Sequence, residues 1–344
     1  MRILLLMDPF IRVPPDHYGG IERVIADLAS GLTRSGHEIT LWAAPGSRVE
    51  GRIAPFGKEG EWTWWSNVRN TATVGARFLA RLRQFDLVHN FGRLAYLAPI
   101  LARDWPKVQT YMRTVNPANM KIARRLGARR LHFTAVSAAI RDTGQTGGGD
   151  WSVIHNCAAR DRYPFVAGTD PRSAPLVFLG RLERCKGAHH AITVADQLGR
   201  QLIIAGNISP LPHERAYFER EIAPRLDGTR VTYIGPVDDA AKRSLLGGAA
   251  AVLMPIEWDE PFPVVLPESM LCGTPLIAFR RGGVPEGIDH GRTGFLCDSV
   301  ADMVAAVGRL AELDRRAVRS EAERRFSDQA IVQAYESLYR RLAA

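Results

Sequence analysis

Short apolar runs alternate with amphipathic segments in the first half of the chain. The run RILLLM (2–7) stops at Asp8 and Pro9, which is typical of a buried parallel strand. In the segment 21–36, apolar residues recur every three or four positions, so a helix with one apolar face is predicted there. The run EITLWAA (38–44) predicts the next strand. This strand–helix–strand unit is typical of a doubly wound α/β domain.

The alternation resumes after a polar stretch, VAGTDPRSAP (166–175), that is typical of a linker. Further strands are expected at 85–91, 107–112, 133–137 and 151–156 before it, and at 174–180, 200–206, 230–235, 250–255 and 274–279 after it. We therefore expect two facing Rossmann-like domains, 1–165 and 166–326, with a cleft between them as the ligand site. A last helix in 327–344 is expected to pack back on the N-terminal domain.

The composition is that of a soluble globular protein, with 46% hydrophobic and 24% charged residues among 344. The N-terminal apolar run is too short for a signal peptide or a spanning helix, so a cytoplasmic location is expected. The four cysteines form no CxxC pair, and the His189–His190 pair has no partner at helical i,i+4 spacing. We therefore expect neither a disulfide framework nor a metal.

The net charge of +9 rests on arginine, because only five of the 45 basic residues are lysine. This skew reflects either genome composition or a positive surface for phosphate-bearing ligands or anionic lipid. In KIARRLGARRLHF (121–133), basic residues stand among apolar ones at helical spacing, so the segment is either a solvated helix face or a helix that contacts a membrane. The cations are otherwise dispersed and no recognition motif is present, which argues against nucleic acid as a partner.

Two cations precede the helix predicted at 187–199. The strand before it ends at Gly180, which is followed by Arg181 and, five residues later, by Lys186. Arginine can bind a phosphate with two parallel hydrogen bonds and lysine acts as a point charge, while the helix N-terminus offers free N–H donors. Each cation alone is more often a solvated surface residue. Together at this junction, they predict a diphosphate site.

Two glutamates, Glu260 and Glu268, stand eight residues apart in the apolar, proline-rich stretch EWDEPFPVVLPESMLCGTPLIAF (257–279). Pro267 is tolerated in the first turn of a helix, so Glu268 is expected there and Glu260 in the loop before it. Without a ligand, Glu268 would stabilise the helix dipole and Glu260 would be solvated in its loop. A carboxylate also accepts hydrogen bonds from vicinal sugar hydroxyls, so the pair could instead hold two sugars.

Three other stretches each allow two interpretations. Gly19 and Gly20, in DHYGGIERV (16–24), form either a plain tight turn or a place where a ligand approaches the backbone. The five glycines of 279–296 form either a flexible loop or one that a ligand or the other domain approaches closely. The aromatic cluster EWTWW (61–65) is expected to pack in the core or a loop rather than to form an acceptor platform.

Taken together, these segments resemble the retaining glycosyltransferases of family 4, which have the GT-B fold. The matching segments run in family order from residue 1 to about 296, and the last carries the family's E-x7-E signature at Glu260 and Glu268. The PPDHYGG opening is also similar to a subgroup that includes antibiotic sugar transferases such as the avilamycin enzyme. The other matching pieces are YGGIERVIADLASGLTRSGHEITLWA, FDLVHNF, AVSAAIRD, SVIHNCAARDRY, FLGRLERCKG, LIIAG and YIGPV.

The resemblance implies that the chain transfers a sugar from a nucleotide-diphosphate donor to a hydroxyl acceptor with retention of the anomeric configuration. A UDP- or GDP-sugar is the expected donor, and the acceptor is expected to belong to glycan, lipid-linked or natural-product biosynthesis. It assigns Arg181 and Lys186 to the diphosphate, Glu268 to the donor ribose and Glu260 to the sugar near the reaction centre. It implies no cofactor and no metal. The donor-binding set that it implies is Gly19, Gly20, Gly180, Arg181, Lys186, Gly235, Val237, Glu260, Phe262, Pro263, Val264, Val265 and Glu268.

The chain departs from the family pattern at two places. Pro263 replaces the usual glycine of EPFG and removes one backbone N–H. Many members carry a histidine after the strand that corresponds to 107–112, whereas this chain has Arg113 nearby and no histidine. Arg113 could substitute as a charge, or the leaving phosphate could take the acceptor's proton. The alternative is a weak or inactive protein that only binds nucleotide sugars. A Rossmann dehydrogenase is disfavoured because no GxGxxG follows a strand.

Overall fold

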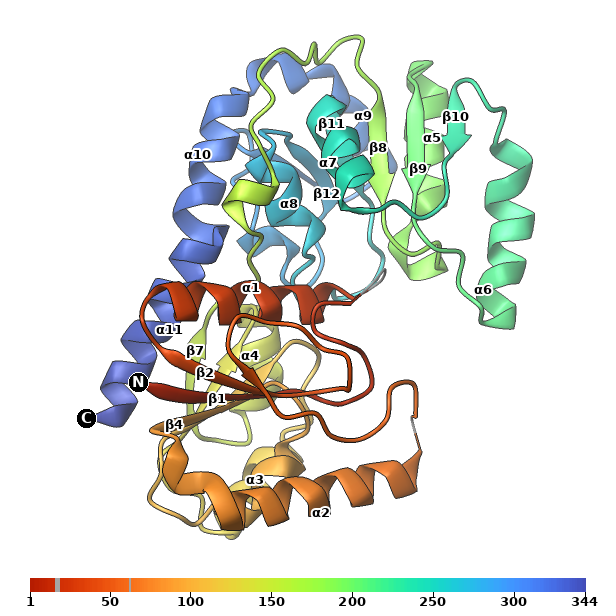
Figure 1. Cartoon of the computed structure of the whole chain (residues 1–344). Coiled ribbons are helices and arrows are strands. Elements are labelled where there is room, and N and C mark those ends of the chain that lie inside the picture. Colours follow the sequence, from red (N-terminus) through yellow and green to blue (C-terminus); the bar gives the residue numbers. More distant parts are fainter. Residues whose placement is uncertain (16–18, 62) are drawn as a thin grey trace. The chain divides into compact units, whose positions relative to one another are not determined.

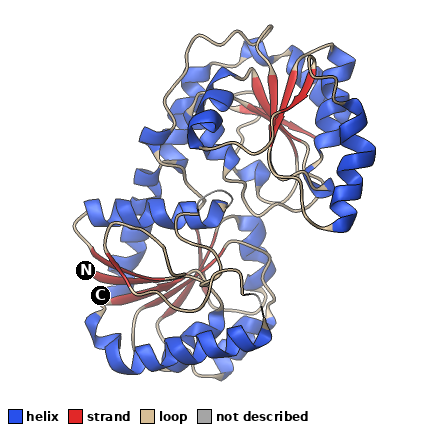
Figure 2. Ribbon diagram, turned by 45° about the vertical axis from the view of Figure 1, so that its right-hand side comes forward, coloured by secondary structure: helices blue, strands red, loops and turns tan. Residues whose placement is uncertain are grey.

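The computed structural model describes residues 1–15, 19–61 and 63–344, and it divides the chain into two compact units (Figure 1). Unit 1 comprises Met1–Cys157 and Asp328–Ala344, and unit 2 comprises Ala158–Ser327. Each contains one parallel sheet with helices on both of its faces (Figure 2). The predicted α/β class with two Rossmann-like domains is confirmed.

The sheet of unit 1 has seven strands in the order β3-β2-β1-β4-β5-β6-β7. Strand β1 is apolar from Ile3 to Leu6, and these residues are fully buried because helices cover both faces of the sheet. The strands are β1 (Arg2–Leu6), β2 (Glu38–Trp42), β3 (Arg52–Ile53), β4 (Leu87–Asn90), β5 (Lys107–Tyr111), β6 (Leu131–Ala135) and β7 (Asp150–Val153). The helices are α1 (Gly20–Arg34), α2 (Trp64–Arg81), α3 (Ala118–Arg125), α4 (Ala138–Gln145) and α11 (Asp328–Ala343).

The sheet of unit 2 has six strands in the order β10-β9-β8-β11-β12-β13. The strands are β8 (Leu176–Leu179), β9 (Leu202–Ala205), β10 (Val231–Tyr233), β11 (Ala251–Met254), β12 (Leu276–Phe279) and β13 (Gly294–Cys297). The helices are α5 (Ala188–Leu198), α6 (Pro212–Tyr217), α7 (Asp239–Gly248), α8 (Val265–Leu271), α9 (Val300–Gly308) and α10 (Arg315–Phe326). In both sheets the order reverses beside the first strand of the unit, which is where open α/β sheets bind ligands.

The structure places the boundary between the units earlier than the sequence predicts. We expected the second domain to begin at residue 166, but the change of unit falls after Cys157. Residues 158–165 belong to unit 2 because their side chains contact it: the Tyr163 hydroxyl bonds to Glu268, and the Phe165 ring lies against Gly273.

The prediction of a helix over 121–133 is correct only for the first five residues, 121–125. Helix α3 ends at Arg125, since Gly127 adopts a φ of +71°, and Leu131 already begins β6. The expectation that EWTWW packs in the core or a loop is wrong for Trp64 and Trp65. Thr63 caps α2, and the next two residues, Trp64 and Trp65, are 67% and 74% exposed. Trp62 lies outside the described residues.

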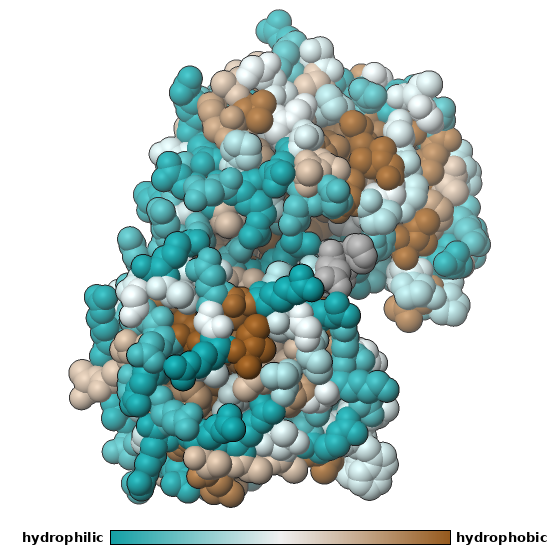
Figure 3. All heavy atoms as spheres, viewed as in Figure 1, coloured by the Kyte–Doolittle hydropathy of each residue, from teal (hydrophilic) through white to brown (hydrophobic). Residues whose placement is uncertain are grey.

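The surface of the molecule is largely hydrophilic on the face shown in Figure 3, where apolar side chains form small separate groups. Among the helices of the described ranges, none combines the length and the apolar character that a membrane span requires.

A buried polar network attaches the C-terminal helix to the sheet of unit 1. The imidazole of His89, on β4, lies 2.5 Å from the Tyr339 hydroxyl of α11 through Nδ1 and 2.6 Å from Thr110 Oγ1 of β5 through Nε2. Two turns before Tyr339 on α11, Val332 contacts Gly31 of α1, where a Cβ would lie 2.4 Å from a Val332 methyl. The last helix is therefore an integral part of unit 1.

This network makes the stability of unit 1 depend on pH. Burial holds the pKa of His89 well below its ordinary value, so the folded chain keeps the ring neutral while the unfolded chain binds a proton below about pH 6.5. The stability that His89 contributes is therefore complete above about pH 6.5 and is lost as the pH falls, by about 1.4 kcal/mol per pH unit. Hydrogen exchange of the β4 and α11 amides between about pH 5 and 8 gives the free energy of unfolding at each pH. We expect this free energy to change less steeply with pH in His89→Gln than in the unaltered protein.

The matched variant Tyr339→Phe removes one hydrogen bond but keeps the buried imidazole. It should lower the free energy of unfolding by about 1 kcal/mol at about pH 8 while its pH slope stays that of the unaltered protein. Equal slopes for all three proteins would contradict this role of His89. Other histidines contribute equally to all three and cancel in the comparison.

Candidate functional site

Three glycines form the edge of the sheet of unit 2 where most of the predicted donor site lies. Gly180, which follows β8, donates its N–H to Ala205 O at 3.0 Å, and Gly206, which follows β9, donates to Gly235 O at 2.9 Å. A Cβ on Gly206 would lie 1.8 Å from Gly180 O, so only glycine fits this approach of two backbones. The backbones at the carboxyl ends of β8 and β9 therefore approach each other closely at these two glycines. Val237 lies on the loop that follows.

Lys186 is positioned by the glycine that follows it. Gly187 begins α5 with a φ of +77°, and a Cβ there would lie 1.9 Å from Pro255 O. This tight turn holds Lys186 just ahead of the N-terminus of α5, as predicted. Its ammonium group forms an ion pair with the carboxylate of Glu260. Arg181 also has an acidic partner, Glu183, which the sequence pattern does not reveal.

Glu260 is shielded from solvent, and its Oε2 atom has two partners. Besides Lys186, it accepts a hydrogen bond of 2.6 Å from the indole N–H of Trp258. The side chains of Lys186 and Glu260 are only 15% and 12% exposed, so the interpretation of Glu260 as a solvated loop residue is wrong. The Lys186 ammonium group also lies 5.3 Å from the centre of the Trp258 ring, a distance at which the ring face attracts a cation.

Two glycines of the 279–296 stretch support the loop that carries Glu260. Gly283 donates its N–H to Glu260 O at 2.7 Å, and a Cβ on Gly282 would lie 2.3 Å from the same oxygen. Gly282 has a φ of +53°, which also favours glycine. A close approach was predicted for this stretch, and the group that approaches these two glycines is the backbone of Glu260. These glycines act on the site indirectly, by fixing the position of Glu260.

Glu268 lies in the first turn of α8, as the position of Pro267 predicts. Its carboxylate is buried and accepts hydrogen bonds from the Tyr163 hydroxyl at 2.6 Å and from Lys242 Nζ at 2.5 Å. Burial, and then the charge of Glu268, raise the pKa of Tyr163 far above its ordinary value, so its hydroxyl remains a donor at any physiological pH. The helix dipole alone does not account for this acid, which has two specific partners.

The two glutamates therefore share one arrangement, in which a lysine and an aromatic side chain each donate to the carboxylate. Sequence reasoning missed the partners Tyr163, Lys242 and Trp258. The sequence did contain a signal for Lys242, because lysine is rare in this chain. In the structure, two of its five lysines pair with the glutamates of the E-x7-E signature. No comparable signal existed for Tyr163, because it lies 105 residues from Glu268.

The residues between the glutamates mainly build the support of the site. Phe262 is buried, with its ring centre 5.4 Å from that of Phe326 on α10. Pro263 is buried too, and its carbonyl accepts the N–H of Leu266 at 3.1 Å. Val264 and Val265 begin α8 and are partly exposed. Contacts of Phe262 and Pro263 with a donor would therefore involve backbone rather than side-chain atoms.

The other predicted residues, Gly19, Gly20 and Arg113, belong to unit 1. Gly19 has a φ of +148° and precedes α1, where a Cβ would lie 2.7 Å from Glu22 Oε2, so glycine is required. Arg113 follows β5, is exposed, and lines a pocket of unit 1 that also includes Asp8. Residues 16–18 of the DHYGG stretch lie outside the described residues.

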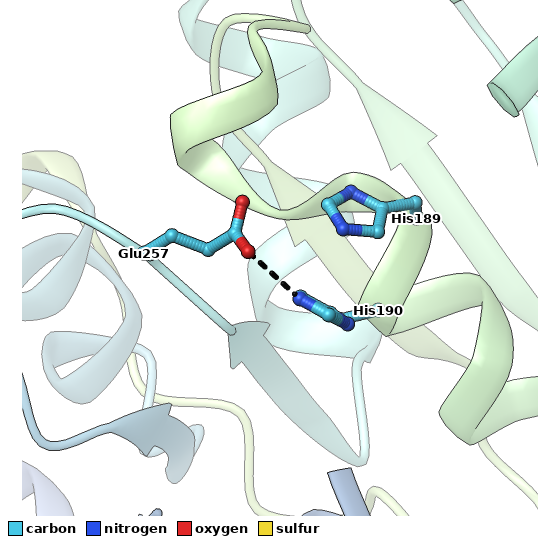
Figure 4. A group of neighbouring side chains, drawn as sticks. All are labelled: His189, His190 and Glu257. Atoms are coloured by element: carbon cyan, nitrogen blue, oxygen red, sulfur yellow. Dashed lines mark hydrogen bonds and ion pairs between the residues drawn. The ribbon is translucent and has the colours of Figure 1, made fainter. Parts of the chain in front are cut away.

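A group of potential metal ligands lies close to Glu260 in the sequence. The ligand atoms of His189, His190 and Glu257 all lie within 4.8 Å of one another (Figure 4). Glu257 thus supplies a partner that the spacing of the histidines does not reveal. Within the group, His190 Nε2 lies 3.2 Å from Glu257 Oε1, and His189 has a partner outside it, because its Nδ1 lies 2.8 Å from the Tyr217 hydroxyl. The expectation that no metal is required stays a prediction.

Two family models together match nearly all of the chain. The model described as glycosyl transferases group 1 matches residues 159–332, just over half of the sequence. The model described as glycosyltransferase family 4 matches residues 18–162.

Similar proteins agree with these matches. A glycogen synthase of Mycobacterium tuberculosis is 28% identical, and the alignment covers 98% of this chain and 94% of that protein. The crystal structure of AviGT4, a glycosyltransferase involved in avilamycin A biosynthesis, is 27% identical with a TM-score of 0.72 and covers 100% of this chain and 98% of that one. Anabaena Alr3699/HepE in complex with UDP and glucose shares the fold, with a TM-score of 0.74, 21% identity and coverage of 98% and 99%.

The pairing of Glu268 predicts a large loss of stability when one partner is removed. Lys242→Met leaves a buried carboxylate without its counter-ion and should lower the free energy of unfolding of unit 2 by about 3 kcal/mol. The double variant Lys242→Met/Glu268→Gln, which removes both charges, should recover more than half of that loss. Hydrogen exchange of the amides of α7 and α8 measures both effects.

The control for this prediction is Lys58→Met, at an exposed lysine of unit 1, which should change stability by less than about 0.5 kcal/mol. If Lys242→Met is equally harmless, or if the double variant is less stable than the single one, the charge pair does not stabilise unit 2.

Proposed function

The chain belongs to the group 1 glycosyl transferases, and on this basis we propose that it transfers a sugar from a nucleotide-diphosphate donor to a hydroxyl acceptor with retention of the anomeric configuration. The observation that carries the proposal is the position of Lys186, which lies at the start of α5, five residues after Arg181, and contacts Glu260. These groups provide what such a reaction requires: cations for a leaving diphosphate and a carboxylate for sugar hydroxyls.

Stabilisation of the leaving group is the main contribution that we assign to unit 2. When the bond between the anomeric carbon and the diphosphate oxygen breaks, negative charge develops on the diphosphate and positive charge on the sugar. Preorganised cations stabilise the first charge without reorganisation during the reaction. Lys186 and Arg181, together with the N–H groups of the α5 N-terminus, have this role in our proposal.

The two glutamates bind different parts of the donor in this proposal. Glu260 accepts hydrogen bonds from hydroxyls of the transferred sugar, and Glu268 accepts them from the ribose. Tyr163 and Lys242 hold the Glu268 carboxylate in place, which lowers the entropy that must be lost when the ribose binds. The acceptor oxygen bonds to the anomeric carbon on the face that the diphosphate leaves, and its proton passes to the departing phosphate oxygen.

The competing proposal is a protein that binds nucleotide sugars without turnover. It is favoured by Pro263, which is buried and has no N–H to offer a donor, and by Arg113, which occupies the region of a family histidine. Proton transfer to the leaving phosphate does not require that histidine. We therefore prefer the transferase.

The location and the biosynthetic context follow from the nature of the reaction. We infer that the protein works in the cytoplasm, where nucleotide sugars are made, on a glycan, lipid-linked or natural-product acceptor. Peripheral membrane contact through 121–133 is a weaker proposal, because α3 is short and the exposed Ile122 and Leu126 line the pocket that contains Arg113.

We predict that the protein slowly releases nucleoside diphosphate from one donor in a panel of UDP-, GDP-, ADP- and dTDP-sugars. Lys186→Ala should lower the rate at least about 100-fold, because one preorganised donor to the transition state is worth about 10²- to 10³-fold. The rate is measured by chromatography of the released nucleotide, with Lys58→Ala as the matched control. Tight donor binding without release, even with acceptor extracts, would favour the binding protein.

We also predict that metal removal leaves this rate unchanged. Lysine, arginine and the α5 N-terminus supply the positive charge in our proposal, so dialysis against a chelator should alter the release rate less than twofold. A loss that Mn²⁺ or Zn²⁺ restores would contradict this prediction. His190→Ala would then show whether the His189–His190–Glu257 group is the site, since it removes one of three ligands.

A further inference from the structure

The pocket in unit 1 lies at the carboxyl edge of the seven-stranded sheet, where the strand order changes direction. From β1 the chain proceeds outward through β2 to β3, and then returns to β4 on the other side of β1. Residues that follow β1, β4 and β5 line the pocket, including Asp8, Arg93 and Arg113. Its volume is about 580 Å³, within the usual range for small-molecule sites.

One wall of the pocket is apolar although it faces solvent. Ile122 and Leu126 are 52% and 55% exposed, and they stand four residues apart, so they share one face of the α3 segment. Leu94, Ala98 and Leu101 line the same pocket from the segment after β4. Large aliphatic side chains at such exposure cost free energy unless something covers them. A sugar or inositol ring would leave hydroxyls unpaired against this wall.

One carboxylate oxygen at the polar end of the pocket has no donor to pair with in the described part of the chain. The side chain of Asp8 is 15% exposed, and its Oδ1 atom has no hydrogen-bond partner among the described residues. The nearest cation, Arg93, lies 3.8 Å away, which is too long for a hydrogen bond. Burial raises the pKa of the Asp8 carboxyl, and Tyr96, Arg93 and Arg113 oppose that shift. An unpaired buried carboxylate oxygen is costly, so a hydroxyl that donates to Asp8 stabilises both groups.

We propose that this pocket selects an acceptor whose hydroxyl group is attached to an apolar ring or chain skeleton. Asp8 accepts the hydrogen bond of that hydroxyl, and Leu94, Ile122 and Leu126 hold the skeleton. The inference rests on the proposed function, because it identifies the class of compound that receives the sugar. Arg93 and Asp8 balance each other's charge, so the skeleton itself needs no charged group.

Binding to this pocket requires no donor, and we would measure it by isothermal titration with three neutral probes: 2-naphthol, 2-methoxynaphthalene and methyl α-glucopyranoside. We expect 2-naphthol to bind at least tenfold more tightly than the other two. The variant Ile122→Glu/Leu126→Glu should weaken 2-naphthol binding at least tenfold. Both side chains are exposed, so the fold tolerates the change. Leu79→Glu, at an exposed apolar position on α2 outside the pocket, is the matched control and should bind as the unaltered protein does.

The role of Asp8 is tested by the preference for 2-naphthol over its methyl ether. Asp8→Ala should abolish this preference, and Asp8→Asn should keep part of it, because the amide oxygen still accepts a hydrogen bond. Tighter binding of the glucoside, or unchanged binding in the wall variant, would overturn the inference. If naphthol selectivity holds but no donor is turned over, the proposed function fails and the pocket assignment stands. If a donor is turned over without naphthol selectivity, the pocket assignment fails and the proposed function stands.

Discussion

The ion pair between Lys186 and Glu260 is the interaction on which the donor site depends. Both side chains are largely removed from solvent, and neither charge would be stable there alone. Several unusual backbone positions serve to bring them together. Gly187 makes the turn that positions Lys186, and Gly282 allows the backbone to approach the loop of Glu260. A second pair, Lys242 and Glu268, repeats the arrangement at the start of α8.

This pairing has a consequence for binding. A diphosphate that reaches Lys186 competes with the carboxylate of Glu260, so in our proposal the donor exchanges one anionic partner of the lysine for another. The carboxylate that is released can then accept hydrogen bonds from the sugar of the same donor. Such an exchange keeps both charges paired throughout, which avoids the cost of leaving either one desolvated and alone. Glu268 keeps its partners in our proposal: Tyr163 and Lys242 both bond to Oε1, so Oε2 can accept hydrogen bonds from the ribose.

Much of the fold could be predicted from the sequence because the two βα series show clear periodicity. Strands such as β1 and helices such as α1 follow directly from apolar spacing, and Pro267 correctly places Glu268 in a first turn. The errors arose where tertiary contacts decide. Gly127 ends α3 early, and the capping of α2 by Thr63 leaves Trp64 exposed, which residue type alone does not indicate.

The candidate site was predicted only in part, for the same reason. Local signals identified Lys186 and Glu260, each beside a glycine or proline that marks a turn. The partners Tyr163 and Lys242 come from distant elements, and no local pattern connects them to Glu268. The glycines of 279–296 stand out in the sequence, but their neighbour is the chain itself rather than a ligand.

The central claim, that Lys186 is the diphosphate partner, is tested most directly by comparing the binding of a nucleoside with that of its diphosphate. Titration calorimetry with uridine and UDP, and with the other nucleoside pairs, gives this difference for each protein. We predict that the diphosphate binds at least tenfold more tightly than the nucleoside to the unaltered protein, and that Lys186→Ala loses most of this preference while its affinity for the nucleoside is unchanged. An undiminished preference for the diphosphate in Lys186→Ala would contradict the claim.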